Sequence, residues 1–126
     1  MSDQKRALVI DDNAEYALLF TTILRGAGYE ASSVDNPATG LSRVRTEPFH
    51  VVLLDNDFVG RALPGQSLVA VLKRQSGAKV IMVTASLDPR TKVDAVAAGV
   101  DAFLTKPVEA DVLLGTVAKV LGVKSS

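Results

Sequence analysis

Residues 51–57 read Val-Val-Leu-Leu-Asp-Asn-Asp, four apolar residues followed at once by two acids and an amide. A second segment has the same form, because Ala7-Leu8-Val9-Ile10 ends at Asp11 and Asp12. Both apolar runs are continuous rather than alternating, which is typical of parallel strands buried on both faces. Carboxylates at the ends of neighbouring strands repel one another unless a cation joins them. The two segments therefore predict an acidic pocket suited to a divalent metal.

The composition is that of one domain. The chain has 126 residues, 48% of them hydrophobic, and ~100–150 residues is the commonest domain size. Lys plus Arg and Asp plus Glu each number 14, so binding to nucleic acid through bulk charge is not expected. Cysteine is absent, which excludes disulfides and thiolate metal ligands.

The first residues are polar and run into too few apolar ones for a signal peptide or a membrane span. We expect a cytoplasmic protein without membrane insertion. It should form a single domain over residues 1–126, with its core at 6–121 and frayed ends.

Three further apolar segments complete a set of five predicted strands. Residues 80–83 form another continuous run and should be central with the first two, whereas residues 31–34 and 102–104 are shorter or more polar and suit the edges of a sheet.

Segments of helical period separate these strands. Asn36-Pro37 and Asp88-Pro89 each place proline after a good N-cap residue and should open helices. Asn13 is a better cap for the first helix than Asp11, and Gly28 suits its end. The apolar residues that mark the five helices are, helix by helix, Tyr16, Phe20, Ile23, Leu24 and Ala27; Leu41 and Val44; Leu68, Val71 and Leu72; Val93, Val96, Ala97 and Val100; and Leu113, Val117, Val120 and Leu121. In the fourth helix these residues are expected to form the buried stripe.

Alternation of strand and helix predicts an α/β fold, a parallel sheet with helices on both faces. Ligands of such sheets bind beyond the carboxyl ends of the strands. Thr84 and Lys106-Pro107 also follow predicted strands, so they should lie at the same edge as the acidic residues.

Asp11-Asp12, Asp55, Thr84 and Lys106-Pro107, in this order at the ends of the first, third, fourth and fifth strands, resemble the receiver domain of two-component response regulators. The resemblance spans about Arg6 to Val120. It implies a CheY-like, flavodoxin-like doubly wound fold, with strand order 2-1-3-4-5 and five flanking helices.

The resemblance also implies a chemistry. Asp55 would accept a phosphoryl group from the phosphohistidine of a sensor histidine kinase or histidine phosphotransfer protein. Mg²⁺, or alternatively Mn²⁺, would be held by Asp12 directly, by Asp11 mostly through water, by Asp55 and by the backbone carbonyl of Asp57. Lys106 would add a positive charge. A carboxylate nucleophile needs such neutralisation of the incoming phosphoryl charge.

The same resemblance assigns a switch to two residues. Thr84 would donate its hydroxyl to a phosphoryl oxygen, and Phe103 would fill the space that Thr84 leaves. The surface formed by the fourth predicted helix, the fifth strand and the fifth helix would carry the change to an unknown downstream target. Phosphoryl transfer would be self-catalysed and autodephosphorylation slow, so the chain would not be a multiple-turnover enzyme.

The sequence departs from the family pattern after Asp55. Val59 and Leu63 stand where receivers usually have proline and glycine, and Pro64-Gly65 follows, which indicates a loop about two residues longer. The Asp57 side chain is either outward and solvated or adds charge at the rim of the pocket. We hypothesise that Asp57 and Ser86 set the phosphoryl lifetime.

Two other functions remain open at this point. Residues 55–59 also resemble the nucleophile motif of haloacid-dehalogenase-type phosphatases, in which Asp57 would be the general acid. The motif order argues against it, because the paired acids precede the nucleophile here. A receiver-like interaction module without phosphorylation is the third possibility. His50 is interpreted as a loop residue without a metal-binding role.

Overall fold

A five-stranded parallel sheet forms the centre of the molecule. The computed structural model describes residues 4–59 and 65–123. The strands are β1 (Arg6–Ile10), β2 (Glu30–Val34), β3 (Val51–Asp55), β4 (Lys79–Thr84) and β5 (Ala102–Thr105). Their order is β2-β1-β3-β4-β5, as predicted, with the more polar strand β2 and the short strand β5 at the edges.

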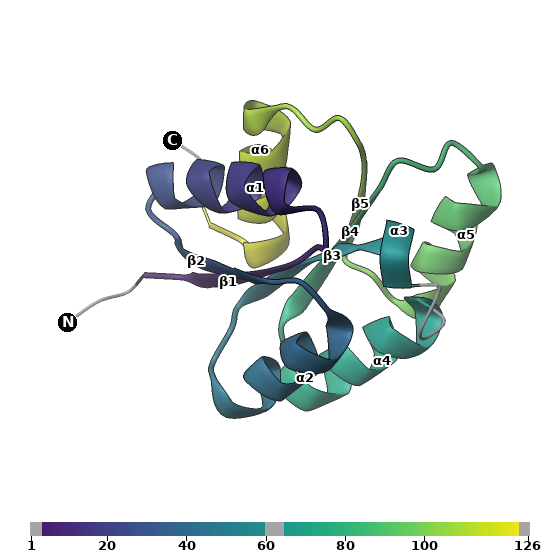
Figure 1. Cartoon of the computed structure of the whole chain (residues 1–126), viewed down its shortest axis with the longest axis horizontal. Helices are drawn as coiled ribbons and strands as arrows, with labels where there is room; N and C mark the ends of the chain where they lie inside the picture. Colours follow the sequence, from purple (N-terminus) through teal and green to yellow (C-terminus); the bar gives the residue numbers. More distant parts are fainter. Residues whose placement is uncertain (1–3, 60–64, 124–126) are drawn as a thin grey trace.

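Helices cover both faces of this sheet (Figure 1). They are α1 (Ala14–Gly26), α2 (Pro37–Thr46), α3 (Asn56–Val59), α4 (Gly65–Ser76), α5 (Pro89–Ala98) and α6 (Ala110–Leu121). Helices α1 and α6 pack on one face, and α2, α4 and α5 on the other. The five predicted helices are all present, and the single turn α3 is an addition that the apolar pattern did not indicate.

Each central strand divides its side chains between two hydrophobic layers. In β1, Leu8 and Ile10 join the layer under α2, α4 and α5, whereas Ala7 and Val9 join the layer under α1 and α6. All five residues of β3 are buried. A continuous apolar run is therefore the pattern that this position in the sheet requires.

The predicted helix ends are confirmed. Asn13, Asn36 and Asp88 are N-caps whose side chains accept backbone hydrogen bonds from the first turns of α1, α2 and α5. Gly28, just after α1, has a φ of 95°, which glycine adopts without strain. These caps fix where each helix leaves the sheet edge that carries the acidic residues.

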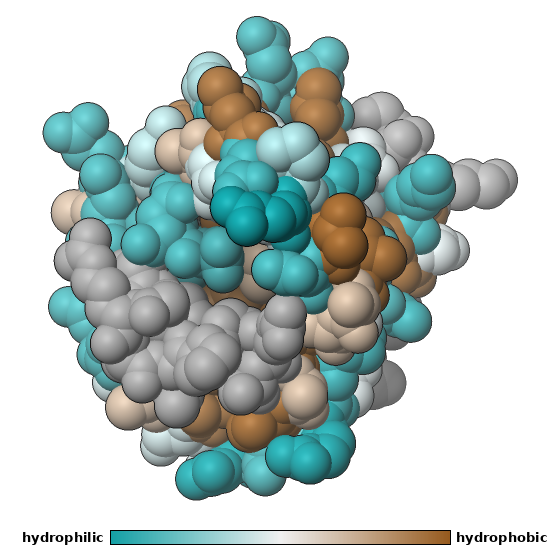
Figure 2. All heavy atoms as spheres, turned by 90° about the vertical axis from the view of Figure 1, so that its right-hand side faces the viewer, coloured by the Kyte–Doolittle hydropathy of each residue, from teal (hydrophilic) through white to brown (hydrophobic). Residues whose placement is uncertain are grey.

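The predicted buried stripe of α5 is wrong for Val93, Val96 and Ala97. Val93 and Val96 are 65% and 59% exposed and Ala97 is also exposed, whereas Ala95 is 2% exposed and Ala98 packs against the core. Val100, just after the helix, packs against the core as predicted. The smaller alanine side chains let α5 lie close to α4 and β5, and the valines turn outward as a result. Figure 2 views the face that carries α5 and shows exposed hydrophobic residues among hydrophilic ones.

Two other sequence interpretations concern connecting segments. His50 accepts a hydrogen bond at Nδ1 from the backbone N–H of Arg6 (2.9 Å), in keeping with its interpretation as a loop residue. The proposed longer loop after Asp55 falls mostly on residues 60–64, outside the described residues. Among the described helices, none has both the length and the apolar character needed to span a bilayer.

Candidate functional site

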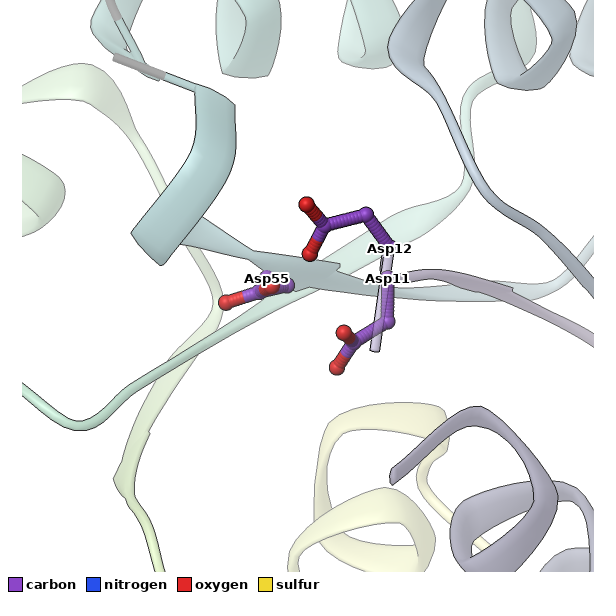
Figure 3. Close-up of side chains that lie close together, drawn as sticks. All are labelled: Asp11, Asp12 and Asp55. Carbon is purple, nitrogen blue, oxygen red and sulfur yellow. The ribbon is translucent and has the colours of Figure 1, made fainter. Parts of the chain in front are cut away.

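Three carboxylates meet where β1 and β3 end. Asp11 and Asp12 follow β1, and Asp55 is the last residue of the neighbouring strand β3. One oxygen from each side chain lies within 4.8 Å of the others, and Figure 3 shows the three groups close together. Asp11 and Asp55 are buried and Asp12 is exposed. The predicted acidic pocket is therefore present.

Lys106, just past the end of β5, places its ammonium group among these carboxylates. Its Nζ lies 3.3 Å from Oδ1 of Asp55 and 3.4 Å from Oδ2 of Asp11. The side chain is only 6% exposed, and Nζ also lies 4.2 Å from the centre of the Tyr16 ring. The pocket thus holds a buried cation that is stabilised by carboxylates and by an aromatic face.

The electrostatics of the pocket fit a further cation. Burial, together with the charge of Asp11, raises the pKa of Asp55 to about 7, although the hydrogen bond from the Asp57 N–H and the charge of Lys106 lower it. Burial lowers the pKa of Lys106, but Asp55 and Asp11 outweigh it and the net shift is upward. The single positive charge of Lys106 does not balance the negative charges of the carboxylates in this pocket. Clustered carboxylate oxygens are the ligands that Mg²⁺ or Mn²⁺ prefers.

Asp57 lies in α3, two residues after Asp55, and its side chain turns into the pocket. Its Oδ1 accepts a hydrogen bond from the Thr84 hydroxyl (2.5 Å), and the N–H of Ala85 donates to both carboxylate oxygens (3.2 and 3.1 Å). Lys106 Nζ lies 3.4 Å from Oδ2. Burial raises the pKa of Asp57, but these donors together lower it. The solvated, outward orientation is therefore not the one that the structure has.

Backbone amides hold two of the carboxylates in place. The N–H of Asp57 donates to Oδ1 of Asp55 (2.9 Å), and the N–H of Asn13 donates to Oδ1 of Asp11 (2.8 Å). Asn13 itself caps α1, so Asp11 positions the entry to the helix without being its cap. Each strand end is thus tied to the turn that follows it.

Not every residue of the predicted site joins the pocket. The hydroxyl of Ser86 lies 3.0 Å from that of Thr91 and accepts from the N–H of Asp88, so it faces the start of α5. Its backbone N–H donates to the Thr84 hydroxyl oxygen (3.1 Å). Phe103 is partly buried against the layer under α2, α4 and α5.

Two groups of the site were not predicted. The Tyr16 ring belongs to the apolar stripe of α1, and nothing in that stripe signalled its contact with Lys106. The backbone N–H of Ala85 could not be recognised from its side chain. Its position directly after Thr84, at the end of a strand, was the only feature that could have indicated it.

Comparisons with known proteins agree with this geometry. A family model for the response regulator receiver domain matches residues 7–118. The DNA-binding response regulator MtrA of Mycolicibacterium paratuberculosis is 32% identical over 114 residues, which cover 90% of this chain and 50% of that protein. The chain therefore spans about half the length of this relative.

Solved structures show the same likeness. A CheY-like response regulator receiver domain protein from Methanospirillum hungatei JF-1 has a TM-score of 0.87 and 29% identity, with 95% of each chain covered. A response regulator protein from Burkholderia pseudomallei, crystallised with a phosphorylated aspartic acid, a calcium ion and citrate, has a TM-score of 0.83 and 28% identity, and the match covers 94% of this chain and 69% of that one.

Proposed function

The chain belongs to the response regulator receiver family and is a receiver domain of two-component signal transduction, and on that premise we propose that Asp55 is its phosphoacceptor. One observation carries the assignment. Strand β3 lies between β1 and β4, so Asp55 stands between the acidic pair Asp11-Asp12 and Thr84. In this position its carboxylate would face a bound metal on one side and hydrogen-bond donors on the other.

The transfer step follows from this placement. A carboxylate oxygen of Asp55 attacks the phosphorus of a phosphohistidine in a sensor histidine kinase or histidine phosphotransfer protein. The new phosphorus–oxygen bond forms as the phosphorus–nitrogen bond breaks, and the imidazole leaves with the electron pair. Lys106, 3.3 Å from Asp55 Oδ1, favours the ionised nucleophile and attracts the phosphoryl oxygens.

The proposed metal ligands are Asp12 directly, Asp11 mostly through water, Asp55 and the backbone carbonyl of Asp57. Mg²⁺ or Mn²⁺, when bound there, would neutralise charge on the phosphoryl group. The Burkholderia protein's crystal structure, with a phosphorylated aspartic acid and a calcium ion, supports this proposal.

A conformational readout is part of the proposal. Phe103 pairs with Met82 across β4 and β5, and Met82 lies two residues before Thr84 on the same side of the strand. A shift of Thr84 toward a phosphoryl oxygen would therefore change the packing of Phe103 and the surface formed by α5, β5 and α6. The downstream target would bind there, and nothing in the charge balance points to direct contact with nucleic acid.

The geometry does not favour the phosphatase alternative. A general acid at Asp57 would need a raised pKa, whereas the donors around this carboxylate lower it. Asp57 is therefore ionised at neutral pH, and we expect slow autodephosphorylation rather than turnover of an external substrate.

The test is labelling by acetyl phosphate, followed by intact mass. The wild-type protein should gain one phosphoryl group only with Mg²⁺ or Mn²⁺, and Asp55→Asn should gain none. A generic phosphate monoester should not be turned over. If the wild-type protein stays unlabelled with acetyl phosphate and with a histidine phosphotransfer protein, the chain is a receiver-like interaction module instead.

A further inference from the structure

The Asp57 carboxylate takes hydrogen bonds from donors that stand beside Asp55. The hydroxyl of Thr84, the amide of Ala85 and the ammonium of Lys106 all point to it, at 2.5 to 3.4 Å. A hydroxyl, a backbone amide and an ammonium form a set that binds the oxygens of an anion. Asp57 thus fills an anion-binding site made by this chain.

The same set borders the proposed phosphoacceptor. Lys106 Nζ lies 3.4 Å from Asp57 Oδ2 and 3.3 Å from Asp55 Oδ1, so one ammonium contacts both side chains. The amide N–H of Asp57 bonds Oδ1 of Asp55 (2.9 Å). A phosphoryl group joined to Asp55 would therefore bring its oxygens to the donors that Asp57 occupies.

Occupation of these donors is exclusive. The hydroxyl of Thr84 and the amide of Ala85 each have a single proton, which serves one strong acceptor at a time. Two anions that share the ammonium of Lys106 would also repel each other. The Asp57 carboxylate and a phosphoryl group therefore cannot both accept hydrogen bonds from these donors.

The Asp57 side chain, rather than the donors, can move out of this site. It is 36% exposed, against 6% for Lys106, while Thr84 is fully buried. Rotation of the Asp57 side chain would return its carboxylate to water without moving a strand. The donors, by contrast, are held by the ends of β4 and β5.

We propose that the Asp57 carboxylate is an internal competitor of the phosphoryl group for Thr84, Ala85 and Lys106. This inference rests on the proposed function of Asp55. The donors are occupied in the unphosphorylated chain, and transfer to Asp55 requires the Asp57 side chain to be displaced. The competition slows phosphorylation and lowers the phosphorylated fraction at a given phosphodonor concentration.

The first test compares labelling rates with acetyl phosphate and Mg²⁺ in the wild-type protein, Asp57→Ala and Asp57→Asn. Asp57→Ala should label about tenfold faster, a factor equivalent to ~1.4 kcal/mol, and Asp57→Asn by a smaller factor, because its amide oxygen is a weaker acceptor. Asp94→Asn is the matched control, since it removes the same charge from an exposed position on α5 and should leave the rate unchanged.

The second test needs no labelling. The amide resonance of Ala85 is followed by ¹⁵N–¹H NMR while inorganic phosphate is titrated in the presence of Mg²⁺. Phosphate should shift this resonance at a roughly tenfold lower concentration in Asp57→Ala than in the wild-type protein. Asp57→Asn provides the same comparison with a side chain of nearly unchanged size.

The outcomes separate the two proposals. Equal labelling rates and equal phosphate affinities in the wild-type protein and both Asp57 variants would overturn the competition and leave Asp55 as phosphoacceptor. If no protein is labelled but phosphate affinity still rises in Asp57→Ala, the proposed function fails while the competition for these donors stands.

Discussion

The ammonium nitrogen of Lys106 lies 3.3 Å from Oδ1 of Asp55, in an ion pair whose two side chains are 6% and 2% exposed. The same nitrogen lies 3.4 Å from the equally buried Asp11. One cation therefore faces two buried carboxylates. This imbalance means that removing the cation and removing a carboxylate should change stability in opposite directions.

Lys106→Met should destabilise the protein, because it leaves Asp11 and Asp55 in a buried site without a positive partner. Loss of one member of a buried pair costs about 3 kcal/mol. Urea denaturation at pH 8 with a chelator measures the change. Lys92→Met, which alters an exposed lysine on α5, should change the free energy of unfolding by less than about 0.5 kcal/mol. Equal effects of the two substitutions would show that the ion pairs do not stabilise the fold.

Asp55→Asn should stabilise the protein, and more at pH 8 than at pH 4. The folded-state pKa of Asp55 is raised to about 7 from an ordinary value of 3.8. The folded protein therefore binds the extra proton between these values, and the penalty for the buried charge grows across that window as pH rises. At pH 8 without metal the gain should be at most about 4 kcal/mol, because each unit of pKa corresponds to ~1.4 kcal/mol. A gain that is independent of pH would contradict this origin.

Asp12→Asn should separate metal binding from folding. Asp12 is exposed, so its substitution should hardly change the melting temperature without metal. In the wild-type protein, Mg²⁺ at a hundredfold excess over its dissociation constant should add ~2.7 kcal/mol of stability, and Asp12→Asn should lose most of this increment. Thermal unfolding with Mg²⁺ and with a chelator provides the comparison. A full Mg²⁺ effect in Asp12→Asn would exclude Asp12 as a ligand.

The strands and the position of the acidic pocket could be predicted from patterns that are local in the chain, whereas the strand order came from the resemblance to receiver domains. Continuous apolar runs mark buried parallel strands, and such strands bring residues at their carboxyl ends together. The buried side of α5 could not be predicted in this way, since valine and alanine are both apolar. Only the depth available beneath the helix favours Ala95 over Val93 and Val96.

The orientation of the Asp57 side chain is a second feature that could not be predicted from the sequence. Its hydrogen bond to Thr84 joins residues 27 positions apart, and the turn of α3 directs the side chain toward that partner. Neither contact leaves a periodic pattern in the sequence. The position two residues after Asp55 could be singled out, but the direction of its carboxylate required the fold.

Glu47 should make part of the stability depend on pH in the acid range. Its carboxylate accepts hydrogen bonds from Arg43 (2.8 and 2.7 Å) and Arg6 (2.7 Å), and these donors lower its pKa from 4.5 to about 2. The stabilisation is present above pH 4.5 and is lost as pH falls toward 2. Glu47→Gln should therefore melt below the wild-type protein at pH 6, by a margin that shrinks with acidification. A constant margin would indicate packing rather than charge.

Gly40 lets α2 lie directly against the end of β1. A Cβ atom there would come within 2.5 Å of Cδ1 and 3.0 Å of Cγ1 of the buried Ile10. Gly40→Ala gains about 1 kcal/mol of helix propensity but overpacks the core by about 1–3 kcal/mol, so it should destabilise by about 1 kcal/mol. Gly115→Ala, on an exposed part of α6 with open space around it, should instead stabilise by about 0.5–1 kcal/mol. Urea denaturation of both variants tests the difference in sign. If Gly40→Ala also stabilises, Ile10 has room to move and the close approach of α2 does not depend on glycine.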